Sequence, residues 1–125
     1  MATANILLVD DEVPFVETMT KRLSKRGINI LTAFSGQEAL GLLAAGKDID
    51  IVVLDVKMPG MDGIELFREI KLIKPDQKYI FISVSSILHD DPEAREILDS
   101  RADGFLGKPY RIHELLSLID SVLQS

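Results

Sequence analysis

Short apolar runs alternate with helical patterns along almost the whole chain. Most of these runs are nearly continuous instead of alternating with polar residues, which is typical of strands buried on both faces of a parallel sheet. They cover residues 6–9, 28–31, 51–54, 79–82 and 105–106. We therefore predict five strands.

Between the runs, apolar residues recur at three and four positions, which predicts amphipathic helices. Pro14 and Gly27 suit the two ends of the first helix, Ser35 and Glu38 have the spacing of a capping box, and the third helix should stop before Pro75. The predicted stripes are Val16, Met19 and Leu23; Ala39, Leu42 and Leu43; Ile64, Phe67 and Ile70; and Leu115, Leu118, Ile119 and Val122, widened by Leu116 and Leu123.

A further helix is expected between the fourth and fifth strands. Asp91 is a suitable N-cap, Pro92 fits the first turn, and the helix should run to about Ser100. The chain then contains five β/α units with short connections. This pattern predicts one α/β domain over residues 1–125, a single doubly wound sandwich with helices on both faces of a parallel sheet.

Polar residues follow four of the five apolar runs. In a parallel sheet the carboxyl ends of the strands share one edge, where ligands bind. The residues expected at that edge are Asp10, Asp11 and Glu12 after the first strand, Asp55 after the third, Ser83 after the fourth and Lys108 after the fifth. The stretch 59–63, which contains two glycines, lets the chain turn sharply away from Asp55.

The acidic residues of this group indicate a cation site. Asp10, Asp11 and Asp55 at neighbouring strand ends would repel one another by ~4 kcal/mol per close pair at an effective dielectric near 20. Folding alone gives no reason to tolerate that repulsion. A hard divalent ion with oxygen ligands would relieve it, and magnesium suits a site that also holds phosphate. Ser83 directly ends its strand, although Ser85 and Ser86 are alternatives for the hydroxyl of the site.

Composition narrows the function further. The formal charge of −6 opposes binding to a nucleic-acid backbone, and no run of basic residues exceeds two. The chain has no cysteine, which excludes disulfides, cysteine-based zinc sites and thiol catalysis. It shows neither a signal-peptide pattern at its start nor an apolar run near the ~18 residues of a membrane span. We expect a cytoplasmic location.

The residues assembled so far closely resemble the receiver domain of bacterial two-component response regulators. The resemblance rests on residues 7–12, 53–63 and 102–110, and it spans nearly the full length. It implies the flavodoxin-like strand order 2-1-3-4-5. It also implies that Asp55 is the phosphoacceptor and that the cofactor is Mg²⁺, with Mn²⁺ as an alternative ion. The implied metal ligands are Asp10, Asp11, Asp55 and the main-chain carbonyl of Lys57.

The resemblance assigns further roles to the remaining site residues. Ser83 and Lys108 would contact the phosphoryl oxygens, and Ser83 would form a switch with the aromatic residue Phe105. The question whether Ser83 or Ser85 is the switch hydroxyl stays open, and so does a plain core role for Phe105. The implied partner is a sensor histidine kinase or a histidine phosphotransfer protein. An effector and a phosphorylation-dependent homodimer are also compatible with the family.

Two other functions compete with this interpretation. A phosphatase of the haloacid dehalogenase type also uses an aspartyl phosphate, but it needs Asp-x-Asp after its first strand, where this chain has Asp10 and Asp11 in succession. A binding module of the same fold that is never phosphorylated is the second alternative. The intact acidic pair, Asp55 and Lys108 argue against it. We expect a regulatory phosphoacceptor that catalyses only its own phosphorylation and dephosphorylation.

Overall fold

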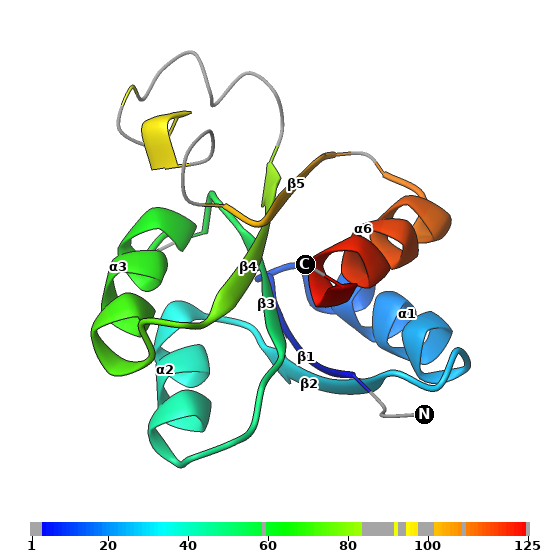
Figure 1. Cartoon of the computed structure of the whole chain (residues 1–125), viewed down its shortest axis with the longest axis horizontal. Coiled ribbons are helices and arrows are strands. Elements are labelled where there is room, and N and C mark those ends of the chain that lie inside the picture. The colour runs from blue at the N-terminus through cyan, green and yellow to red at the C-terminus, as the bar shows by residue number, and fades with distance from the viewer. Residues whose placement is uncertain are drawn as a thin grey trace.

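The computed structural model describes residues 4–58, 60–83, 92, 95–97, 102–108 and 110–124. Within those ranges, strands and helices alternate along the chain (Figure 1). The strands are β1 (Asn5–Val9), β2 (Asn29–Ala33), β3 (Ile51–Asp55), β4 (Lys78–Ser83) and β5 (Gly104–Gly107). The helices are α1 (Val13–Ser24), α2 (Gly36–Ala44), α3 (Gly63–Ile73) and α6 (Ile112–Gln124).

The five strands form one parallel sheet with the order β2-β1-β3-β4-β5, which confirms the predicted fold class. Helices α1 and α6 cover one face of the sheet, and α2 and α3 cover the other (Figure 1). Successive side chains of a strand point to opposite faces, so β1 contributes Leu7 and Val9 to one apolar cluster and Ile6 and Leu8 to the other. Two cores therefore sandwich the sheet.

The predicted helical stripes form the inner faces of the helices. In α1 the buried residues are Val16, Met19 and Leu23, and Gly27 adopts a φ of +80° in the turn after the helix. The Ser35 hydroxyl accepts a hydrogen bond from the Glu38 N–H at 3.2 Å and caps α2. The Glu38 carboxylate in turn accepts from the N–H of Phe34, one residue before the expected partner.

Some predicted boundaries and positions are wrong. β2 runs over Asn29–Ala33 instead of 28–31; it is the edge strand, so only one residue of it, Ala33, is fully buried and its apolar pattern is weak. Leu123 does not widen the buried face of α6, because its side chain is 39% exposed near the end of the helix.

The predicted fourth helix falls largely outside the described residues, and so do Ser85 and Ser86. Pro92 and residues 95–97 have helical backbone, in agreement with that prediction, and Ile97 is buried against the cluster on the α2 and α3 face. None of the described helices has the length and apolar character needed to cross a membrane.

Candidate functional site

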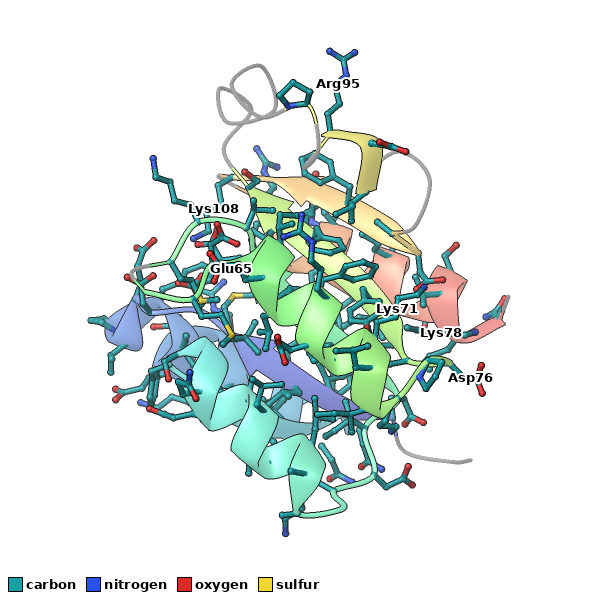
Figure 2. All side chains as sticks on the ribbon, turned by 90° about the vertical axis from the view of Figure 1, so that its left-hand side faces the viewer. Glu65, Lys71, Asp76, Lys78, Arg95 and Lys108 are labelled. Carbon is teal, nitrogen blue, oxygen red and sulfur yellow. The ribbon has the colours of Figure 1, made fainter. Side chains whose placement is uncertain are left out.

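The carboxyl ends of β1, β3 and β5 bring the predicted polar residues together. Asp10 directly follows β1, Asp55 is the last residue of β3, and Lys108 directly follows β5. In the view of Figure 2, Lys108 and Glu65, which is in the first turn of α3, appear toward one end of that helix, and Lys71, Asp76 and Lys78 appear toward the other end. The site thus occupies the edge that parallel-strand topology predicts.

Three carboxylates form an acidic group at this edge. Asp10, Asp11 and Asp55 each offer an oxygen, and these oxygens lie within 4.8 Å of one another. Asp10 is 1% exposed and Asp55 is 6% exposed, whereas Asp11 faces solvent. The predicted grouping of these carboxylates is therefore present in the structure.

The ammonium group of Lys108 lies among the carboxylates. Its Nζ is 2.8 Å from Asp55 Oδ2, 3.0 Å from Asp10 Oδ2 and 3.1 Å from Glu12 Oε1. The Lys108 N–H donates to the Ser83 carbonyl at 2.9 Å, which ties its main chain to the end of β4. An ammonium group has three N–H donors, so these carboxylates use all of them.

The turn between β3 and α3 fixes the orientation of Asp55. The Lys57 N–H donates to Asp55 Oδ1 at 3.1 Å, and the Gly63 N–H donates to the Val56 carbonyl at 2.8 Å. A Cβ atom on Gly63 would collide with the Asp55 carbonyl oxygen, so the start of α3 can approach β3 only with glycine at this position. Gly60 takes a φ of +75°, as the predicted turn requires.

For Asp10 and Lys108, burial and the interaction between their opposite charges shift the pKa in opposite directions. Burial raises the pKa of Asp10, although the Glu12 N–H and Lys108 lower it, and the charge of Asp55 adds to the increase. Burial alone would lower the pKa of Lys108, but hydrogen bonds to Asp55 and Asp10 and their negative charges outweigh it, so its pKa rises. Lys108 therefore stays charged, while Asp10 carries its charge at a cost.

The donor set fits a hard divalent cation. Carboxylate oxygens are the ligands that Mg²⁺ prefers, and Asp11 leaves the group open to solvent, as suits an ion that keeps several waters. One lysine offsets only part of the negative charge of Asp10, Asp11, Glu12 and Asp55. The Lys57 N–H donates to Asp55 Oδ1, and the Lys57 carbonyl stays a predicted metal ligand.

The two predicted switch residues differ in burial. Ser83 is fully buried at the end of β4, one residue beyond Ile82, the residue that pairs with Asp55. Phe105 pairs with Phe81 in the register of β4 and β5 and is 36% exposed, which does not match a plain core role.

Sequence reasoning did not assign roles to three residues around Lys108. Glu12 follows the acidic pair directly, yet its ion pair with Lys108 was not predicted. The Phe15 ring lies 5.3 Å from Lys108 Nζ, and Tyr110 contacts that ring edge-on at 5.8 Å between centroids. The proximity of Glu12 to Asp10 was a signal in the sequence, whereas the aromatic contacts depend on tertiary packing that brings Phe15 of α1 beside Lys108 and Tyr110.

The acidic residues and the lysine lie together at the carboxyl edge of the sheet, where doubly wound folds bind their ligands. Comparison with known proteins agrees. The response regulator receiver domain family matches residues 6–120, and the chain belongs to that family. The chain is therefore a regulatory signalling domain of the two-component type. Such domains bind Mg²⁺ at an acidic group like this one and work with histidine kinases or phosphotransfer proteins.

Individual relatives support the same assignment. The chain is 37% identical over 123 residues to the sensor kinase CckA of Brucella abortus, covering 98% of this chain and 13% of that protein. It is 34% identical over 119 residues to the response regulator SaeR of Staphylococcus aureus, covering 95% of this chain and 50% of SaeR. The chain thus spans half or less of the length of these relatives.

A solved structure extends the comparison to three dimensions. The response regulator TrrA of Thermotoga maritima, in complex with Mg²⁺-BeF, superposes with a TM-score of 0.80 at 32% identity, covering 96% of this chain and 99% of TrrA. Family membership favours a receiver domain over the phosphatase alternative.

Proposed function

We propose that Asp55 accepts a phosphoryl group and that this modification switches the domain between two states. The observation that supports this most strongly is the position of the Asp55 carboxylate. It lies within the acidic group and, at 2.8 Å, directly against the Lys108 ammonium. A carboxylate attacks phosphorus poorly because both carry negative oxygens, so a site for this reaction needs positive charge held in place beforehand.

The transfer itself is a displacement at phosphorus. An oxygen of Asp55 forms a bond to phosphorus while the bond from phosphorus to an imidazole nitrogen of the donor breaks, and that nitrogen keeps the electron pair. The donor would be a phosphohistidine on a sensor kinase or a phosphotransfer protein. Water later cleaves the acyl phosphate and restores the carboxylate, so the domain would catalyse only its own phosphorylation and dephosphorylation.

Asp10, Asp11, Asp55 and the Lys57 carbonyl would hold Mg²⁺, or Mn²⁺ in its place. The bound ion supplies charge neutralisation to the phosphoryl oxygens. Lys108 would release at least one carboxylate and donate to a phosphoryl oxygen instead. The Ser83 hydroxyl would approach the phosphoryl group from the end of β4, with Ser85 as the alternative.

The structural change caused by phosphorylation would be transmitted to the surface by Ser83 and Phe105. The exposed ring of Phe105 lies on the edge strand, so a change in its position could be sensed by a partner. The phosphoryl group can shift this equilibrium only by binding the two states differently. As the output, we propose either an effector or a phosphorylation-dependent homodimer. We propose no direct contact of this segment with nucleic acid or membrane. We also propose that residues 1–125 form one domain, located in the cytoplasm.

Incubation with acetyl phosphate, followed by intact mass spectrometry, tests this function. We expect one added phosphoryl group with Mg²⁺, none with EDTA and none in Asp55→Ala. The control Asp48→Ala removes an exposed carboxylate after α2, away from the site, and should be phosphorylated normally. A lack of phosphorylation in the wild type would favour the binding-module alternative. Sustained turnover of an aryl phosphate would favour the phosphatase.

A further inference from the structure

An aromatic ring lies beside the ammonium group that joins the carboxylates. Phe15, in the first turn of α1, presents its ring 5.3 Å from Lys108 Nζ. The ring is half-buried, and Tyr110 meets it edge-on, with the two planes at 88°. A lysine ammonium within about 6 Å of a ring centroid is attracted by the negative charge of the ring face. Lys108 therefore has a fourth partner, the Phe15 ring, which is uncharged, unlike the three carboxylates.

The three charged contacts of Lys108 cannot all persist in the phosphorylated domain. Asp55, Asp10 and Glu12 occupy every N–H of the ammonium group, so a phosphoryl oxygen can gain a bond only when a carboxylate loses one. Two of these carboxylates belong to the proposed metal site. Their oxygens would turn from the lysine toward the cation, which weakens their hold on Lys108. The Phe15 ring is not a metal ligand, so a bound metal ion would not draw it away from Lys108.

We propose that Phe15 is a positioning residue, which keeps the Lys108 ammonium at the site while it exchanges a carboxylate for a phosphoryl oxygen. This inference rests on the proposed function, in which Lys108 binds the phosphoryl group. Phe15 matters little when three carboxylates hold the lysine, and more once the metal engages Asp10 and Asp55. Loss of the Phe15 ring should therefore weaken the binding of the phosphoryl group and leave the binding of the metal unchanged.

Tyr110 supports this arrangement through its ring. Its hydroxyl is buried and has no hydrogen-bond partner among the described residues. A buried hydroxyl without a hydrogen-bond partner costs stability, whereas the ring of Tyr110 packs edge-on against Phe15. The substitution Tyr110→Phe removes the hydroxyl and keeps the ring. It is a matched control for the loss of an aromatic face at Phe15.

The experiment measures two affinities separately in the full chain. Mg²⁺ is titrated first, and beryllofluoride, as a phosphoryl analogue, is then titrated at saturating Mg²⁺, with NMR resonances of the site as the signal. We expect Phe15→Leu to weaken beryllofluoride binding about two- to fivefold, the range of an exposed cation–π contact, and to leave Mg²⁺ affinity unchanged. Phe15→Tyr, which restores an aromatic face, should recover most of the loss, and Tyr110→Phe should match the wild type.

Each other outcome overturns the inference. Equal losses of Mg²⁺ and beryllofluoride affinity in Phe15→Leu would indicate general damage to the site. Unchanged beryllofluoride binding in Phe15→Leu would show that the ring does not position Lys108. A loss in Tyr110→Phe as large as that in Phe15→Leu would assign the effect to the hydroxyl. If the wild type binds no beryllofluoride at all, both the proposed function and this inference fail. The outcomes above, in which the wild type binds, overturn only the inference about Phe15.

Discussion

Replacing Lys108 by Met tests the electrostatics of the site directly. Methionine keeps the length of the aliphatic stem and removes only the charged end. In the metal-free protein this leaves Asp10 and Asp55 buried without their cation. The pair with Glu12 matters less, because the Glu12 side chain is 61% exposed and solvent screens it.

The expected loss is large. At an effective dielectric near 20, charges about 3 Å apart interact by roughly 5 kcal/mol, before any desolvation cost is counted. Removing one partner of a buried ion pair costs about 3–5 kcal/mol, and the lower end applies because the Lys108 side chain is 17% exposed. A loss of about 3 kcal/mol corresponds to a melting temperature lower by roughly 10 °C in a domain of this size.

Urea unfolding followed by circular dichroism in EDTA and in saturating Mg²⁺ measures the effect. We expect the loss of about 3 kcal/mol in EDTA to shrink to less than half in Mg²⁺, because a bound cation stabilises the variant more than the wild type. The control Lys47→Met removes an exposed lysine outside the site and should change the free energy of unfolding by less than about 0.5 kcal/mol. Equal losses for Lys108→Met in EDTA and in Mg²⁺ would show that Lys108 does not act by offsetting the charge of these carboxylates.

Two further substitutions test other parts of the structure by urea unfolding. Gly63→Ala should cost about 1–3 kcal/mol, because its Cβ would press on the Asp55 carbonyl, whereas Gly41→Ala in α2 has open space and should be neutral or stabilising; equal effects would contradict the close approach. Burial, and then the charge of Asp103, raise the pKa of Tyr79, so the unfolded chain loses this proton first and stability falls as the pH rises above about 10. Tyr79→Phe should remove part of that alkaline decline, and an unchanged pH profile would contradict the assignment.

Much of the fold follows from elementary patterns in the sequence. The run that forms β3 is buried at every position, because this strand lies in the middle of the sheet with helices on both faces. Such a strand can be recognised from apolar continuity alone. β2 lies at the edge, where neighbours cover it incompletely, so four of its five residues are exposed or only partly buried and its apolar run marks its ends poorly. The boundary error is a consequence of that position.

The site was predictable where it depends on topology and unpredictable where it depends on side-chain packing. Asp10 and Lys108 are 98 residues apart, yet both follow parallel strands, so their meeting at one edge is expected. The ring of Phe15 reaches Lys108 through the packing of α1 on one face of the sheet. No local pattern in the sequence encodes that packing. The same reason explains why the contact between Phe15 and Tyr110 was missed.

Asp55 is the residue that we propose carries the phosphoryl group. Borohydride reduces an aspartyl phosphate to homoserine, so the modified position can be read from the sequence of the reduced peptide. After treatment with acetyl phosphate and Mg²⁺, we expect homoserine at position 55 and unmodified aspartate at positions 10 and 11. Homoserine at Asp10 or Asp11, or a stable phosphate on Ser83, would contradict it.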